Sequence, residues 1–258
     1  MPRYKLTVAY EGTDFHGWQK QEPPDRAPLR TVQGVLEEAV CKVVGERVTV
    51  VGASRTDSGV HAFGQVAAFS TTREIPLERL PRAITARCPS DLQVVEARQV
   101  EESFDPISDA MRKRYQYTIQ HGRGLPPLLD RRLIWHTHHD LDHRLMNEGA
   151  GLLVGTHDFE PFASASHGRE STVRTIEECI VDPLPGSRVR IAVVGDGFLY
   201  NMVRIIAGSL LEIGRGARTP LSIREALERG DRALTGPTLG PEGLLLEWIE
   251  YPSDRPAG

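Results

Sequence analysis

The order in which strand and helix patterns alternate is the feature that most limits how this chain can fold. In the first hundred residues, alternating apolar side chains indicate strands over 4–10, 48–51, 65–71 and 92–100. Apolar residues spaced three and four apart indicate helices over 32–43 and 76–87, with Thr31 as N-cap and Gly45 just past the first helix. The predicted order is strand, helix, strand, strand, helix, strand, which is that of a split βαβ, ferredoxin-like unit.

The rest of the chain repeats that order and adds one helix near its end. Strand patterns cover 114–120, 172–181, 188–194 and 244–251. One helical pattern begins near Asp140, and two more cover 199–213 and 222–228. The run Asp182–Gly186 carries a turn signal between two strands. We therefore predict an α+β fold of two ferredoxin-like halves, residues 1–105 and 106–258.

Composition places the chain among ordinary globular proteins. Of its 258 residues, 40% are hydrophobic and 26% charged. No stretch approaches the roughly 18 apolar residues of a membrane span, and the N-terminus enters a strand pattern directly, so we expect neither a membrane segment nor a signal peptide. Three scattered cysteines without a CxxC pair argue against a disulfide framework and a zinc site, and they fit the reducing cytoplasm.

The net charge of the chain does not decide whether it binds nucleic acid. The net charge of −4 and the isoelectric point near 6.2 count against a protein coated in nucleic acid. A cleft can still concentrate positive potential, because the local field steers an encounter. Basic clusters occur at Arg112–Arg114, Arg131–Arg132, Arg188 with Arg190, and Arg215 with Arg218. Taken alone, each cluster is more often a solvated face than a binding patch.

Several common chemistries lack their motifs. The sequence has neither a GxxxxGK[ST] phosphate loop nor a GxSxG nucleophile elbow. Gly149, Gly151 and Gly155 do not have the spacing of a dinucleotide fingerprint. These absences argue against nucleotide hydrolysis and hydride transfer.

Four histidines near residue 140 raise the possibility of a metal site. They are His136, His138, His139 and His143. Zinc needs three or four converging ligands, whereas this group spans a strand-to-helix junction and has no cysteine. We therefore prefer an exposed junction with Asp140 as the helix cap and predict no metal.

The stretch 53–65, ASRTDSGVHAFGQ, admits two interpretations. Asp, Ser and Gly favour a turn between strands, which is the commoner use of such residues. Alternatively, Arg55 keeps Asp57 ionised, and the carboxylate acts as a nucleophile at a sugar carbon or an electron-poor ring. One acid without a second fits a glycosidase poorly, because such enzymes flank the bond with two carboxylates.

Residues 55–61, RTDSGVH, resemble the RTDxGVH signature of the tRNA pseudouridine synthase A family. Further stretches resemble that family's motifs in the same order: 10–19 (YEGTDFHGWQ), 114–117 (RYQY), 198–204 (FLYNMVR) with 208–210 (GSL), and 242–244 (EGL). The similarity runs from about residue 4 to residue 251. Ser54 and Ser58 depart from the family's usual wording, G-R-T-D-A-G, and Ser54 matters if its position needs a positive φ.

The resemblance implies a fold, a reaction and a site. It implies a pseudouridine synthase fold with a central, mainly antiparallel sheet, in which residues 1–105 carry the aspartate loop and residues 106–258 complete an RNA cleft. The reaction is isomerisation of uridine to pseudouridine at nucleotides 38 to 40 in the anticodon arm of tRNA. The family works as homodimers with no cofactor and no metal.

The same resemblance assigns roles to four residues. Asp57 is the nucleophile, at C1′ or C6 or by assisting a glycal, and Arg55 offsets the cost of flipping the target base. Tyr115 stacks on the base or removes the proton at C5. Arg204 holds the Asp57 carboxylate.

Two other functions remain as alternatives. One is a non-catalytic RNA-binding protein of the same fold, and the other is an RNA or nucleoside glycosidase that releases the base.

Overall fold

The computed structural model describes residues 1–22, 27–164 and 170–252, and it divides into two compact units. Unit 1 comprises Met1–Met111 and Leu246–Gly258, and unit 2 comprises Arg112–Leu245. The sequence-based halves met at 105/106 and left the C-terminal strand with the second half. In the structure most of that strand belongs to unit 1.

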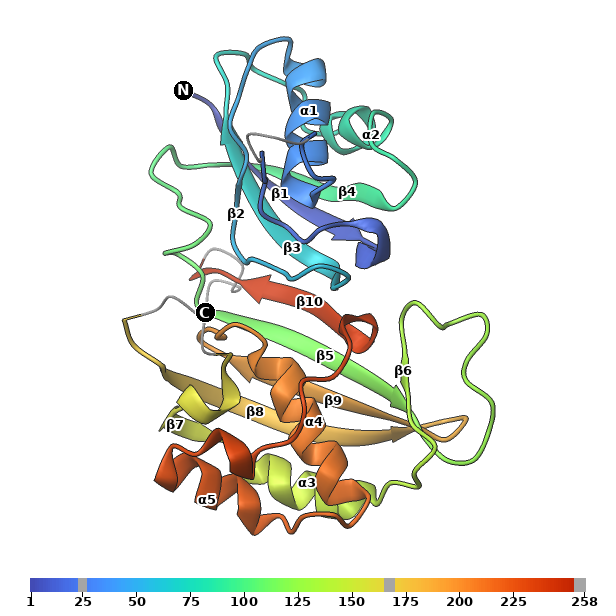
Figure 1. Ribbon diagram of the computed structural model, residues 1–258. Helices are drawn as coiled ribbons and strands as arrows, with labels where there is room; N and C mark the ends of the chain where they lie inside the picture. The colour runs from blue at the N-terminus through green and yellow to red at the C-terminus, as the bar shows by residue number, and fades with distance from the viewer. Residues whose placement is uncertain (23–26, 165–169, 253–258) are drawn as a thin grey trace. The chain divides into compact units, whose positions relative to one another are not determined.

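Unit 1 is a twisted sheet with two helices beside it (Figure 1). Its strands are β1 (Arg3–Tyr10), β2 (Val51–Gly52), β3 (His61–Ser70), β4 (Leu92–Val100) and β10 (Leu244–Glu250, of which 246–250 belong to this unit). They follow the order β4–β1–β3–β10, with the short β2 also paired to β3. β1 pairs antiparallel with both β3 and β4. The path β4–β1–β3–β2 has the strand order expected of a ferredoxin-like unit.

The helices of unit 1 are α1 (Val32–Val44) and α2 (Leu80–Thr85), and a 3₁₀ turn covers Gly12–Asp14. Both predicted caps of α1 are confirmed: the Thr31 side chain accepts a hydrogen bond from Gly34 N, and Gly45 ends the helix at φ 72°. α2 is shorter than the predicted 76–87. Residues 77–79 instead form a turn before the helix, in which Arg79 N donates to Pro76 O and Leu80 N donates to Leu77 O.

Unit 2 consists of mainly antiparallel strands with three helices beside them (Figure 1). Its strands are β5 (Arg112–Gln120), β6 (Trp135–His136), β7 (Gly155–Asp158), β8 (Val173–Leu184) and β9 (Arg188–Gly195). They follow the order β5–β9–β8–β7, and β6 pairs parallel with β5. The helices are α3 (His143–Gly151), α4 (Met202–Gly214) and α5 (Leu221–Arg229). Short 3₁₀ turns cover Glu160–Phe162, Arg232–Leu234 and Pro241–Gly243.

Two local predictions in unit 2 are wrong. The turn between β8 and β9 is not Asp182–Gly186, because the antiparallel register continues through Leu184 opposite Arg188. The chain reverses at Gly186 (φ 79°) and Ser187 (φ 54°), which adopt the left-handed conformation. The cap of α3 is Asp142 rather than Asp140, since Asp142 Oδ1 accepts hydrogen bonds from the amides of Arg144 and Leu145.

Each unit buries its own core. Fully buried aromatic and aliphatic side chains include Tyr4, Leu36 and Phe69 in unit 1 and Tyr117, Ile206 and Leu210 in unit 2. The predicted α+β class with a mainly antiparallel sheet is confirmed. Of the helices in the described ranges, none has the length and apolar character needed to cross a membrane.

Candidate active-site loop

The loop 53–60 joins β2 to β3 and carries Arg55 and Asp57. β2 pairs with Ala67 and Ala68, well inside β3, so the loop returns along the start of β3. Val60 N donates to Asp57 O at 3.2 Å, and Gly59 has φ 80°, as expected of a type II turn with glycine at its third position. The predicted turn is confirmed. Asp57 is half-buried and Arg55 exposed.

The N-terminal segment 15–18 holds the loop on both sides of Asp57. Trp18 N donates to Thr56 O at 3.0 Å. Gly59 N donates to Phe15 O at 3.3 Å, and Ser58 Oγ donates to the same oxygen at 3.2 Å. The backbone next to Asp57 is therefore anchored by a segment about forty residues earlier in the chain, which explains why the two motifs occur together.

Gln65 anchors the other flank of Arg55. Its side chain is fully buried, and its amide group binds the backbone of Ser54 twice: Nε2 donates to Ser54 O at 2.7 Å, and Oε1 accepts from Ser54 N at 3.2 Å. Gln65 Nε2 lies 3.4 Å from Tyr10 Oη, which forms a 2.8 Å hydrogen bond with Thr56 Oγ1. The role of Gln65 was not predicted from the sequence. Its signal was one buried amide among the mainly apolar residues of β3.

Ser54 does not need the conformational freedom of glycine. Among the described residues other than glycine, only Ser187 and Asn201 have a positive φ. The condition under which the serine at position 54 would matter, a positive φ, is therefore not met. Ser58 is also accommodated, because its hydroxyl hydrogen-bonds to Phe15 O.

Gly12 and Gly17 allow the N-terminal segment to approach the loop closely. A Cβ atom on Gly12 would overlap the carbonyl group of Val60, and the Gly12 amide donates to His61 Nδ1 at 2.9 Å. Gly17 has φ 83°, and a Cβ there would lie 2.8 Å from Thr56 O. Both positions therefore require glycine, one for space and one also for conformation.

Tyr115 lies in the middle of β5 in unit 2. It is opposite Val193 of β9, and its side chain is 6% exposed. Its ring packs edge-to-face against Phe198, with the centroids 5.1 Å apart and the planes at 81°. Phe198 begins the stretch FLYNMVR, so two of the sequence motifs meet at this contact.

Arg204 lies in the first turn of α4, also in unit 2. Its Nε donates to Leu239 O at 2.7 Å, and its Nη1 donates to Asn201 Oδ1 at 2.7 Å. Asn201 has φ 62° and donates from Nδ2 to Ser164 Oγ at 2.9 Å. Two donors of the guanidinium are thus fixed, which sets its orientation. Asn201 was missed from the sequence, although asparagine is among the few residues that adopt this conformation readily.

The four predicted site residues divide equally between the units. Arg55 and Asp57 share one loop of unit 1, whereas Tyr115 and Arg204 lie on β5 and α4 of unit 2. The histidine group near residue 140 is arranged differently from a metal site: His136 and His138 stack edge-to-face, with centroids 4.7 Å apart. The described residues contain no group of three or more His, Cys, Asp or Glu side chains placed to hold a metal ion.

Replacing Gln65 by leucine should destabilise unit 1. The substitution removes both hydrogen bonds to Ser54 in a buried setting, so we expect a loss of about 2–3 kcal/mol in the free energy of unfolding. Urea denaturation followed by circular dichroism measures it. The exposed Gln99→Leu on β4 is the matched control and should change stability by less than about 0.5 kcal/mol. Equal stability of the two variants would contradict the anchoring role.

The fold and the anchored loop first indicate a class of protein. An α+β protein built on antiparallel sheets, with an aspartate on an anchored loop between strands, is consistent with the pseudouridine synthase fold. The model of the family described as tRNA pseudouridine synthase matches residues 6–107 and 150–252. The chain belongs to this family, and the resemblance stated from its motifs is confirmed, as is its assignment to a class of isomerases.

Curated relatives match over nearly the whole chain. A tRNA pseudouridine synthase A of Thermoanaerobacter sp. (strain X514) is 41% identical over 97% of this chain and 100% of its own length. A tRNA pseudouridine synthase A 2 of Clostridium perfringens is 40% identical over the same shares. A tRNA pseudouridine synthase A of Myxococcus xanthus is 40% identical over 100% of this chain and 95% of its own. A crystal structure of a Cbf5-Nop10-Gar1 complex superposes with a TM-score of only 0.35 at 10% identity, covering 80% of this chain and 54% of that one.

Proposed function

We propose that this protein isomerises uridine to pseudouridine in tRNA, at positions 38, 39 and/or 40 of the anticodon stem-loop, with Asp57 as the nucleophile. Family membership and the names of the relatives support the reaction. The observation that carries the residue assignment is the anchoring of the loop. The loop is held through the backbone of Ser54 and Thr56 before Asp57, and through the hydroxyl of Ser58 and the amide of Gly59 after it. This is the preorganisation that a catalytic carboxylate needs.

The reaction is balanced without a co-substrate. The glycosidic bond from C1′ to N1 breaks, the uracil turns while it stays bound, and a bond forms from C1′ to C5. The C5 proton leaves and N1 gains one. A single carboxylate is sufficient because the departing base is also the returning partner. Asp57 attacks C1′ or C6, or assists a glycal route.

Three further residues act on the substrate in this proposal. The exposed Arg55 side chain offsets part of the few kcal/mol that extruding the target base costs. Tyr115, positioned by Phe198, stacks on the base or removes the C5 proton. Arg204, oriented by Leu239 and Asn201, is a fixed cation for a carboxylate or a phosphate.

The same family resemblance supports a cytoplasmic homodimer that binds the anticodon arm and needs no metal or cofactor. Acting on tRNA requires the protein to concentrate positive charge locally, because its net charge is −4.

Incubation with unmodified tRNA that carries tritium at uridine C5 should release tritium but no free uracil. A set of tRNAs that each carry uridine at just one of positions 38, 39 and 40 identifies the target. A tRNA with no uridine at any of these positions is the control. Free uracil would instead establish the glycosidase alternative. Tight binding of tRNA with no release of tritium would establish a non-catalytic RNA-binding protein.

A further inference from the structure

Acidic partners neutralise most of the basic clusters found in the sequence. In unit 2, ion pairs join Arg112 to Glu177, Arg114 to Glu178, Arg188 to Asp130, Arg190 to Asp182 and Arg215 to Glu212. These pairs have N–O distances between 2.6 and 3.1 Å. A neighbouring carboxylate reduces the positive potential that would attract a phosphate, so these clusters are weaker candidates for binding RNA than arginines without an acidic partner.

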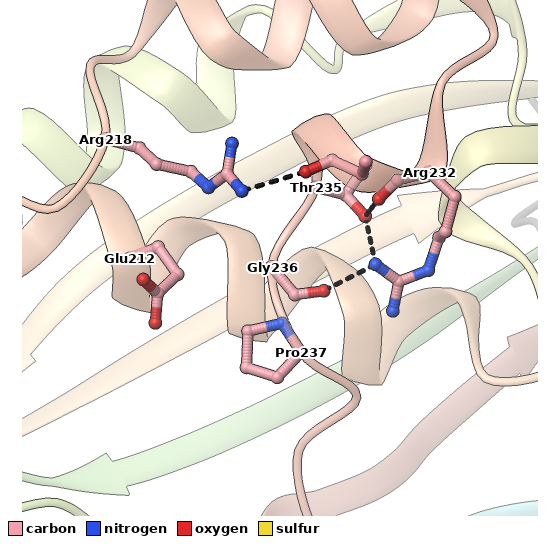
Figure 2. Close-up of a pocket in the computed structure, with 7 residues that line it drawn as sticks. Glu212, Arg218, Arg232, Thr235, Gly236 and Pro237 are labelled. Carbon is pink, nitrogen blue, oxygen red and sulfur yellow. Dashed lines mark hydrogen bonds between the residues drawn. The ribbon is translucent and has the colours of Figure 1, made fainter.

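Arg215 is paired with Glu212, whereas Arg218 of the same basic cluster shares a pocket with a second arginine, Arg232. Arg218 and Arg232 line one pocket of about 340 Å³, together with Glu212, Ala233 and residues 235–237. Figure 2 shows the two guanidinium groups on either side of the chain at Thr235. Within the part of the chain that the structure describes, neither forms an ion pair with a carboxylate.

Backbone carbonyl groups hold both guanidinium groups in place. Arg218 Nη2 donates to Ala233 O at 2.9 Å, and Arg232 Nη1 donates to Gly236 O at 2.8 Å and to Thr235 Oγ1 at 2.5 Å. Partial desolvation lowers the pKa of Arg232, which is the direction expected of a cation without a compensating acid. The one acid in the lining, Glu212, has both oxygens bound by Arg215, at 3.0 and 2.6 Å.

We propose that the pocket of Arg218 and Arg232 binds a phosphate of the tRNA backbone. The hydrogen bonds above use only part of the N–H donors of each guanidinium, so donors remain for the two non-bridging oxygens of a phosphodiester. A free phosphate has more acceptor oxygens, and the nearby amides of Ala233, Thr235 and Gly236 already donate to Asp231, Arg232 O and Ser209. The lining has no aromatic side chain on which a base could stack.

Neither Tyr115 nor Arg204 lines this pocket. Glu212 is eight residues after Arg204 on α4, which corresponds to about 12 Å along the helix axis. The inference rests on the proposed function, because it takes tRNA as the substrate. It adds a contact that anchors the RNA away from the reacting nucleotide.

The test is the salt dependence of tRNA affinity. Each neutralised phosphate adds about −0.7 to −0.9 to the slope of log K against log salt concentration. We expect the double variant Arg218→Gln/Arg232→Gln to bind unmodified tRNA roughly three- to tenfold more weakly at about 0.15 M salt, with a slope shallower by about one. Arg232→Lys should keep most of the wild-type slope, because it retains the charge.

The control is Arg224→Gln, an exposed arginine of α5 that does not line the pocket. It changes the net charge by one, half of the change in the double variant, and should leave the slope unchanged. An equal effect of Arg224→Gln, or a wild-type slope in the double variant, would overturn the proposal. Thermal melts of every variant establish that the folded protein is being compared.

Two further measurements separate the possible outcomes. At constant ionic strength, replacing chloride by 10 mM inorganic phosphate should not compete with tRNA, and competition that disappears in the double variant would make the pocket a small-anion site instead. Tritium release at saturating tRNA should be unchanged in the control Arg224→Gln, whose side chain lies outside the pocket. If the wild type releases no tritium, the proposed function fails. If it releases tritium and the slope does not respond, only the pocket fails.

Discussion

Asp57→Asn should lower the rate of tritium release from C5-tritiated tRNA by at least about a thousandfold. Asparagine keeps the size of the side chain but removes the negative charge, and an amide is a poor nucleophile. The described anchors of the loop use the backbone of Thr56 and Gly59 and the hydroxyl of Ser58, so the fold should survive the substitution. Single-turnover assays with excess enzyme measure the chemical step without a contribution from product release.

Two companion variants make that result interpretable. Ser58→Ala keeps the carboxylate and loses one hydrogen bond to Phe15 O, so its rate should fall by less than about tenfold. Asp57→Ala guards against deamidation of the introduced asparagine, which would regenerate aspartate. A wild-type rate from Asp57→Asn, with the substitution verified by mass spectrometry, would remove the nucleophile assignment. It would leave the family membership untouched.

Gly12→Ala should have the largest effect on stability, a loss of about 3–5 kcal/mol in the free energy of unfolding. The added methyl group would overlap the backbone carbonyl of Val60, and a backbone atom cannot swing away as a flexible side chain can. The 3₁₀ turn that begins at Gly12 would then have to separate from the end of the loop. Denaturant unfolding measures the loss. If the turn is displaced only partly from the loop, the variant should remain soluble but release tritium more slowly.

Gly151→Ala is the matched control for this steric argument. Gly151 is the last residue of α3, and no heavy atom lies within 4 Å of where its Cβ would be. Because alanine has the higher helix propensity, this variant should be neutral or more stable by up to about 1 kcal/mol. Similar stabilities for the two glycine variants would show that the contact between Gly12 and Val60 relaxes without cost.

Local sequence patterns predict this fold where the determinants are themselves local. Thr31 and Gly45 mark the ends of α1 because capping depends on residues within one turn of the helix. β6 and β7 were not predicted, since two and four residues are too few to establish a period. The turn after β8 was misplaced because strand register, a property of two strands together, carried Asp182–Leu184 into the ladder.

The candidate site follows the same division. The turn at Asp57 was predictable from Asp, Ser and Gly, which act within four residues. Gln65 was not, because its role depends on partners 11 and 55 residues away, Ser54 and Tyr10. Asn201 needed the knowledge that Arg204 and Ser164 lie on either side of its amide. The motifs of the family point to such positions without giving the physical reason.

The anchoring of the loop by residues 15–18 has a consequence for protein engineering. A peptide of residues 53–65 contains every letter of the RTDSGVH motif, yet it lacks the carbonyl of Phe15 and the amide of Trp18 that fix its backbone. The smallest unit that keeps the conformation of the loop therefore contains two separate segments of the sequence rather than one. Transferring this aspartate to another protein would require both the loop and residues 15–18, held in register by the pairing of β1 with β3.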